Sequence, residues 1–349
     1  IDRIRELLIV CRNGFCDGPR STACPEEMAN DLLSSAYFGE GSIQILIQIH
    51  PKGFLLCREN DAIGIQNDLV FGEGRFQQMY DLNSAYLCDM EVEFTFLGTG
   101  TSQGVPIIAC ECGVCSSSDA RDQRLRSSVL VQVAGVSVVI DTGPDFRQQC
   151  LRAGVKALDA VVFTHEHKDH VAGLDDIRPF NFRSGRDMPI FATERVQEAL
   201  QREFKYIFES TYPGVPKVSM HTIDTDEFDI GGVAWWPLLL HHHQLPVLGF
   251  RVGGFAYITD ANQISEQALA RLNGVDVLVL NALRREPHLS HFTLDEAVDW
   301  AKRIGARQTY FTHISHQLGH HADVERELPP GIGLAYDGLK GVAFGKGCD

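Results

Sequence analysis

The chain has 349 residues and a formal net charge of −15, and 44% of its residues are hydrophobic while 22% are charged. These values are typical of a soluble globular protein with one large domain or two smaller ones. The negative balance argues against a broad nucleic-acid-binding face. No apolar run approaches the ~20 residues of a membrane-spanning helix, so we expect no membrane partner.

The first 89 residues differ in character from the rest. Of the 14 histidines, only His50 lies before residue 90, and the one clear strand-like alternation is SIQILIQI at 42–49. The first residues lack a small-residue cleavage site behind a basic leader, so we do not expect export. At Met90 a strand and a Gly-rich turn, MEVEFTFLGTGTSQGVP, are typical of a domain start. We therefore expect an N-terminal extension of unknown role at 1–89, either a small domain or sequence upstream of a start at Met90, and a main domain at 90–349.

After Met90, short β-branched runs recur, and most end in a polar or ionisable residue. They are SSVLVQVA, VSVVIDTG, LDAVVFTH, VAWWPLLL, GFAYITD, VDVLVLN and QTYFTH. Helical patterns lie between some of them, and TLDEAVDWAKRIG begins with Thr293 followed by Glu296, the spacing of a capping box. Strands in succession, followed by strands alternating with helices, predict an α/β (α+β) fold with helices covering sheet layers.

The segment FTHEHKDHVAG at 163–173 gathers four candidate metal ligands directly after an apolar strand: His165, His167, Asp169 and His170. They converge only if the backbone turns sharply, as it does where a strand leads into a helix. Neutral imidazoles with a carboxylate suit zinc, manganese or iron rather than calcium. The alternative is a solvated, polar helix start.

Further ligands are expected at later strand ends. A run of three histidines, 241–243, follows PLLL; Asp260 follows AYIT; and His313 follows QTYFT. An unpaired polar group beside these buried runs would cost a few kcal/mol. A purely structural role, or an exposed loop end, is the alternative for Asp260 and His313.

Residues 90 to about 344 resemble the metallo-β-lactamase superfamily, whose signature is H-x-H-x-D-H, and within it the PhnP-like phosphodiesterases. The matching segments follow the family's order: FLGTGTSQGVP, CECGVC, IDTG, THEHKDH, HQLPVLGF, ITDA, SHFTLDEA, THISHQ and YDGLKG. They span about three quarters of the chain and exclude the first 89 residues. The resemblance implies an αββα sandwich with two divalent metals, zinc or manganese, at one edge of the sheets.

The resemblance also implies the ligands of this binuclear site. They are His165, His167 and His243 for one metal, Asp169, His170 and His313 for the other, and Asp260 as the bridge between them. His243 is chosen from the histidine run because its distance to Gly249 matches the family's spacing. His241 and His242 are then neighbours of unknown role.

A second metal site is predicted around the cysteines of CECGVC. Cys110, Cys112 and Cys115 have a spacing better suited to a metal than to a disulfide, and this placement favours a reducing cytoplasm. Three thiolates need a fourth ligand to close a tetrahedral zinc site. His316 is the natural fourth ligand, and the PhnP-like pattern uses the matching histidine. Such a closed structural zinc would brace the loop; three unrelated buried thiols are the alternative.

Two metals a few Å apart lower the pKa of a water molecule held between them, so that it becomes hydroxide, and they offset charge in the transition state. This chemistry suits hydrolysis of a phosphodiester, a thioester or a lactone. The resemblance favours a small cyclic phosphodiester such as 5-phosphoribosyl 1,2-cyclic phosphate. It implies that Asp169 also orients the hydroxide and that His291 faces the substrate, where it stabilises a phosphoryl oxygen or protonates the leaving alkoxide. The alternatives for His291 are a helix cap or a solvated ring.

Several points stay open at this level. Arg284 and Arg285 either contact a second phosphate of the substrate or lie in a solvated loop. The sequence is compatible with a homodimer but does not decide the oligomeric state. A tRNA 3′-end nuclease would need an RNA-binding arm and a basic balance, neither of which is seen. The complete ligand set disfavours both a PqqB-like protein and a zinc-braced, non-catalytic binding module.

Overall fold

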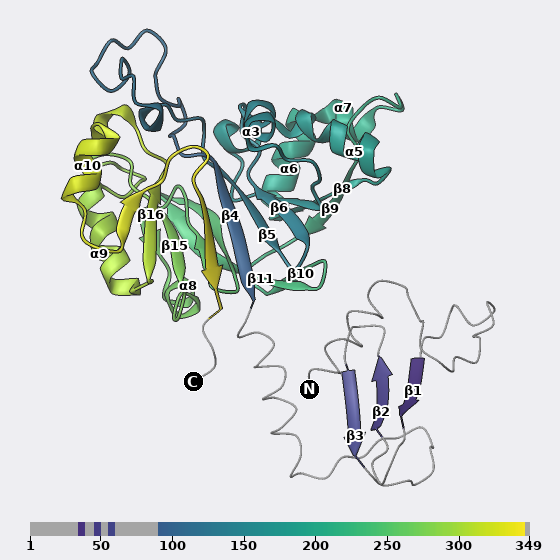
Figure 1. The fold of residues 1–349 in the computed structure, drawn as a ribbon. Coiled ribbons are helices and arrows are strands. Elements are labelled where there is room, and N and C mark those ends of the chain that lie inside the picture. The colour runs from purple at the N-terminus through teal and green to yellow at the C-terminus, as the bar shows by residue number, and fades with distance from the viewer. Residues whose placement is uncertain (1–33, 39–44, 50–54, 60–89, 346–349) are drawn as a thin grey trace. The chain divides into compact units, whose positions relative to one another are not determined.

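The computed structural model describes residues 34–38, 45–49, 55–59 and 90–345 (Figure 1). The chain divides into two compact units, residues 1–72 and 73–349, which are considered separately. The boundary predicted near residue 89 lies at the edge of a stretch outside the described residues, and it stays a prediction. No helix within the described ranges is long and apolar enough to cross a membrane.

The described part of the first unit is one antiparallel sheet in the order β1-β2-β3. Its strands are β1 (Ser34–Phe38), β2 (Ile45–Ile49) and β3 (Leu55–Glu59). The strand expected within 42–49 corresponds to β2, whose Ile47 pairs with Ala36 on one side and Cys57 on the other.

The second unit contains two larger sheets. The first has the order β18-β4-β5-β6-β7-β8-β9, with β4 Glu91–Gly98, β5 Ser128–Val133, β6 Val136–Ile140, β7 Ala160–Val162, β8 Met188–Ala192, β9 Val218–Thr222 and β18 Lys340–Phe344. The second has the order β10-β11-β12-β13-β15-β16-β17, with β14 paired to β11. Its strands are β10 Phe228–Ile230, β11 Val233–His242, β12 Leu245–Val252, β13 Phe255–Tyr257, β14 Gln263–Ile264, β15 Val277–Asn281, β16 Gln308–Thr312 and β17 Ile332–Leu334.

Helices cover the outer face of each sheet (Figure 1). The first sheet carries α3 Phe146–Ala153, α4 Lys168–Val171, α5 Arg178–Ser184, α6 Glu194–Glu203 and α7 Lys205–Glu209, and the second carries α8 Glu266–Arg271, α9 Leu294–Ile304 and α10 His321–Glu327. Short 3₁₀ turns are η1 Ala120–Asp122, η2 Leu174–Ile177 and η3 His316–Leu318. The capping box predicted for α9 is confirmed, because Thr293 and Glu296 exchange both bonds.

The core lies between the two sheets, and strand alternation explains it. Val129 and Val131 of β5 face the inner core, while Leu130 faces the helices of the first sheet. Because both faces of the strand are buried, the sequence is a continuous apolar run. Across the interface, the rings of Phe94 and Phe255 stack with centroids 4.8 Å apart. The predicted αββα sandwich is therefore confirmed.

The strands deliver polar residues to a common edge. β6 and β7 run parallel, as do β13, β15 and β16, so the carboxyl ends within each set lie at the same edge of their sheet. At three of these ends the backbone turns through the left-handed region, with φ of 65° at Asp141, 54° at Asp260 and 54° at His313. Non-glycine residues rarely adopt this conformation, and such strain is typical of functional sites.

Candidate metal centres

The H-x-H-x-D-H segment leaves β7 and is clamped against the end of β6. Thr142 donates its N–H to the His170 carbonyl at 2.8 Å, and Gly173 donates to the Thr142 carbonyl at 2.8 Å. A Cβ on Gly143 would lie 2.1 Å from the Asp169 carbonyl oxygen, so only glycine allows this approach. These contacts produce the sharp turn that the four ligands need.

Asp141, to which the sequence analysis assigned no role, orients His170 directly and His165 through Thr164. Its carboxylate accepts from the Thr164 N–H at 2.9 Å and hydroxyl at 2.8 Å, and it lies 2.7 Å from His170 Nδ1. Because the single Thr164 hydroxyl proton goes to Asp141, that oxygen accepts from His165 Nδ1–H at 2.9 Å. The position of Asp141 at the end of the run VSVVIDTG was the available signal.

Both buried rings therefore turn Nε2 toward the same space. His165 and His170 are fully buried, and within the described residues neither Nε2 has a hydrogen-bond partner. Leaving such a nitrogen unpaired costs about 1–3 kcal/mol. A divalent metal would satisfy both, so the residues present fit a metal.

Two carboxylates lie beside His170 Nε2, one from the neighbouring residue and one from the segment after β13. Asp169 Oδ2 lies 3.1 Å and Asp260 Oδ2 lies 3.2 Å from this nitrogen, and His313 Nδ1 lies 3.1 Å from the same Asp260 oxygen. One candidate ligand atom from each of these four residues lies within 4.8 Å of the others. Burial alone would lower the pKa of His170, but the three carboxylates of Asp169, Asp260 and Asp141 outweigh it and raise that pKa well above its usual value.

In the histidine run, a neighbour of the expected ligand lies nearer to the other predicted ligands. The ring of His242, not that of His243, lies 5.2 Å from the His167 ring and 5.8 Å from the His165 ring. His243 is exposed in the two-residue turn between β11 and β12, where its φ is 59°. Strand alternation places His242 on the same face as the buried Leu240. The spacing to Gly249 is measured across the hairpin turn, so it does not determine which histidine of β11 shares that face.

His242 also has a fixed ring orientation. Its Nδ1 lies 2.9 Å from the Ser290 carbonyl oxygen, which can only accept, so Nδ1 carries the proton and Nε2 keeps a free lone pair. His242, Asp260 and His291 offer ligand atoms within 4.8 Å of one another.

His291 lies within this group rather than in solvent. The residue is 8% exposed, and its ring centroid is 4.5 Å from that of His242 and 4.8 Å from that of His313. Burial lowers the pKa of His291 to about 2. Thr293, not His291, caps α9, so neither the helix-cap nor the solvated alternative fits.

Arg284 and Arg285 are bonded to the chain itself. The Arg284 guanidinium donates to the carbonyls of Glu286 and Pro287 and to the Gln317 side chain at 3.0 Å. Arg285 donates to Glu327 at 2.7 Å. Both therefore brace the loop that leads to His291.

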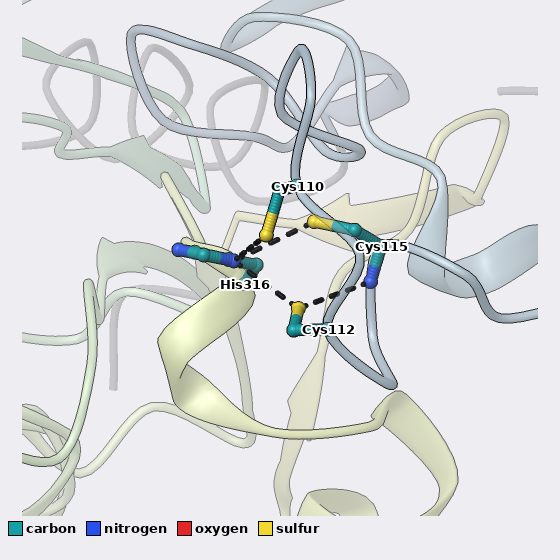
Figure 2. Close-up of side chains that lie close together, drawn as sticks. All are labelled: Cys110, Cys112, Cys115 and His316. Carbon is teal, nitrogen blue, oxygen red and sulfur yellow. Dashed lines mark hydrogen bonds between the residues drawn. The ribbon is translucent and has the colours of Figure 1, made fainter.

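The predicted cysteine cluster also comes together (Figure 2). The Sγ atoms of Cys110, Cys112 and Cys115 lie 3.4, 3.3 and 3.5 Å from His316 Nδ1. The Cys115 N–H and the His316 ring lower the pKa of Cys112 to about 6, which favours the thiolate that binds metal. Three thiolates and an imidazole fit a closed tetrahedral zinc site.

Comparison with known proteins agrees with this geometry. The family model described as the beta-lactamase superfamily domain matches residues 137–314. A crystal structure of a new diphosphatase from the PhnP family is 45% identical with a TM-score of 0.69, over 73% of this chain and 99% of that one.

Two curated relatives carry different names. An octanoyltransferase of Porphyromonas gingivalis is 39% identical over 255 residues, 72% of this chain but 51% of the relative, so the chain spans about half its length. The coenzyme PQQ synthesis protein B of Methylorubrum extorquens is 27% identical over 223 residues, 53% of this chain and 71% of the relative. By its family match and its 45% identity to the diphosphatase, the chain belongs to the metallo-β-lactamase superfamily and, within it, to the PhnP family.

Proposed function

We propose that this protein is a metal-dependent hydrolase that cleaves a P–O bond in a small phosphodiester. The observation that carries the proposal is the convergence of His165, His170 and His242, each of whose Nδ1 is engaged by the chain itself. Because each Nδ1 is bonded to the chain, Nε2 is the ring atom that could bind a metal beside the Asp260 carboxylate. A PhnP-family relative at 45% identity is a diphosphatase, which also acts on a phosphorus centre.

The proposed ligands differ from the expected set only in the histidine run. They are His165, His167 and His242 for one metal, Asp169, His170 and His313 for the other, and Asp260 between them. Divalent metals bound there would lower the pKa of a coordinated water and offset charge on the phosphoryl group. Asp141 and Ser290 hold the rings that must keep their orientation while substrate binds.

His291 is the proposed catalytic residue that serves the leaving group. Its Nδ1 lies 3.9 Å from Asp260 Oδ1 and has no hydrogen-bond partner in the described part of the chain. The N–H of a neutral imidazole at this place can donate a hydrogen bond to the leaving oxygen as negative charge develops on it. Asp169 contributes a carboxylate that can orient the attacking water.

A small cyclic phosphodiester such as 5-phosphoribosyl 1,2-cyclic phosphate is the first substrate to test, and a diphosphate is the second. Arg284 and Arg285 are already bonded to the chain, so a second phosphate would need another partner. We therefore expect that a minimal diester, which lacks the second phosphate, is also hydrolysed.

A thioester is the second candidate substrate class. The observation in its favour is the name of the octanoyltransferase relative, which is 39% identical to this chain. Because the chain spans only about half of that relative, an acyl-transfer activity could belong to the remainder of that protein.

The decisive experiment measures turnover by the full chain loaded with zinc or manganese. The substrates are bis(p-nitrophenyl) phosphate, 5-phosphoribosyl 1,2-cyclic phosphate, 2′,3′-cyclic nucleotides, a nucleoside diphosphate and an octanoyl thioester. We expect the cyclic phosphodiester to give the highest kcat/KM. Absence of turnover on every phosphate ester with both metals bound would contradict the proposal, and turnover of the thioester alone would support the second candidate.

His291→Ala tests the assignment within the site. We expect kcat to fall about a hundredfold with metal content unchanged, because removing one positioned hydrogen-bond donor to a developing negative charge costs about 10²–10³-fold. His221→Ala, at an exposed histidine of β9, is the matched control. Loss of metal from the His291 variant would show instead that this ring is a ligand.

A further inference from the structure

The loop at residues 284–291, here called the histidine loop, is a built element rather than a loose connection. Its two ends are closed by the Leu283 N–H, which donates to the Phe292 carbonyl at 3.0 Å, and by the Phe292 N–H, which donates to the Ala261 carbonyl at 3.0 Å. The Arg284 guanidinium fills its interior by donating to two loop carbonyls. The loop ends in His291 and exposes 69% of Leu289.

Besides the His242 ring, which bonds the Ser290 carbonyl directly, one further side chain links this loop to the β11–β12 hairpin. Asn262 Nδ2 donates to the Leu289 carbonyl at 3.0 Å, while Asn262 Oδ1 accepts from the His243 N–H at 2.9 Å. Its backbone N–H donates to the His241 carbonyl at 2.9 Å. A carboxamide satisfies both partners in one orientation only, because it has one donor end and one acceptor end.

The segment that carries Asn262 is itself fixed from behind. The buried Asn281, at the end of β15, donates to the Ala261 carbonyl at 2.9 Å and accepts from the Ala261 N–H at 2.9 Å. Asp260 directly precedes Ala261. Two asparagines therefore hold the bridging carboxylate segment, the hairpin and the histidine loop in one arrangement.

We infer that Asn262 is a positioning residue that sets the distance between His291 and the His242–Asp260 pair. This inference rests on the proposed function. Asn262 touches neither group with its side chain, but it fixes the residues next to each: His243 beside His242, and Leu289 two residues before His291. Small displacements of reacting groups cost large factors in rate, so the carboxamide controls turnover without taking part in the chemistry.

The kinetic test is a double-mutant cycle with His291. Asn262→Ala should lower kcat about tenfold, with KM changed less than about twofold, because the reacting group is displaced while substrate binding persists. In a His291→Ala background the same change should have no further effect, since the residue acts through that ring. If the fall in kcat of the double variant equals the product of the two single falls, the inference is overturned.

Two further variants separate the linking bonds from general effects. Asn262→Asp keeps an acceptor for the His243 N–H but sets an oxygen against the Leu289 carbonyl, so it should behave like the alanine variant. Asn273→Ala is the control, because this exposed asparagine follows α8 and its side chain makes no hydrogen bond within residues 90–345. Equal losses in the Asn273 and Asn262 variants would overturn the inference.

Hydrogen exchange gives a readout independent of activity. In Asn262→Ala, peptides covering 284–292 should exchange faster than in the unmodified protein, while Asn273→Ala should leave them unchanged. Unchanged exchange and unchanged kcat in the Asn262 variant would overturn the inference. If the unmodified protein hydrolyses none of the substrates, the proposed function fails, and the exchange measurement still decides whether Asn262 holds the loop.

Discussion

The two candidate metal centres are built in opposite ways. The histidine–aspartate edge collects side chains from the ends of β7, β11, β13 and β16, and His165, His170, Asp260 and His313 are almost fully buried. The cysteine cluster takes three ligands from six consecutive residues and one from η3, and Cys112 is exposed. The first depends on the whole sandwich, whereas the second depends on one loop and one turn.

In the proposed function, this difference separates a reactive site from a bracing one. Metal sites built from imidazoles and carboxylates can keep a position open for water and substrate. Three thiolates and an imidazole complete a tetrahedron and leave no open position. Each prediction below treats the two centres as independent in metal content and unequal in their effect on turnover.

The largest effect is expected from Asp260→Ala. This carboxylate lies 3.2 Å from His170 and 3.1 Å from His313, so its removal takes the shared ligand from the edge. Turnover should fall by about a thousandfold or more. Elemental analysis should show loss of metal from the edge while the cysteine cluster keeps its zinc. Loss of metal from both centres together would break the comparison.

A matched pair, His242→Ala and His243→Ala, tests which histidine completes the edge. Removing the His242 ring deletes a proposed ligand, so turnover should fall about a hundredfold. His243 is exposed in the turn and uses only its backbone N–H toward Asn262, so its variant should stay within about twofold of the unmodified rate. The reverse order of effects in a kinetic assay would restore the sequence-based choice.

This pair also shows where sequence reasoning ended. The residues of the H-x-H-x-D-H and C-x-C-x2-C motifs are close in sequence, so their spacing alone predicted that they lie close together. Asp260 and His313 were reached because each follows an apolar run, and the family resemblance assigned them to the metals. In the histidine run the structure places His242, rather than the expected His243, beside His167, because a two-residue hairpin turn changes which side chain faces inward.

Residues that orient ligands were harder to predict. Asp141 and Asn262 carry no metal-binding pattern, and their roles depend on hydrogen bonds to Thr164 and to backbone groups far along the chain. Fold class followed from apolar runs that end in polar residues, because burial on both faces of a strand gives that pattern. The residues that orient ligands depend on distances between segments far apart in the chain, and a sequence motif does not give those distances.

Asp141→Asn should have an intermediate effect at the edge. The amide oxygen can still accept from Thr164. The amide is neutral, however, and its NH₂ end cannot accept a hydrogen bond, so the contact with His170 Nδ1 is weakened. Outer partners of metal-binding histidines contribute 10–100-fold, so affinity for the edge metals and turnover should each fall by about that range. A chelator competition measures affinity. Unchanged affinity would mean that Thr142 and Gly173 alone hold the segment.

The smallest effect on turnover is expected from Cys112→Ser, although it should remove the zinc of the cysteine cluster. His313 lies three residues before His316, but the chain between them is held separately: Ile314 donates to the Thr99 carbonyl at 2.9 Å, and Ser315 donates to the Leu283 carbonyl at 3.0 Å. These backbone bonds should keep His313 in place, so turnover should fall only about twofold to fivefold while Tm falls by about 5 °C.

Cys150→Ser, at a half-buried thiol of α3 outside the cluster, is the control for this loss of stability. A fall in turnover as large as that of Asp260→Ala would show that the two centres act as one. In that case the segment from His313 to His316 would be the connection between them, because it is the one stretch that supplies a proposed ligand to each centre within the described residues. The size of the Cys112 effect therefore measures how far a bracing site controls a reactive one.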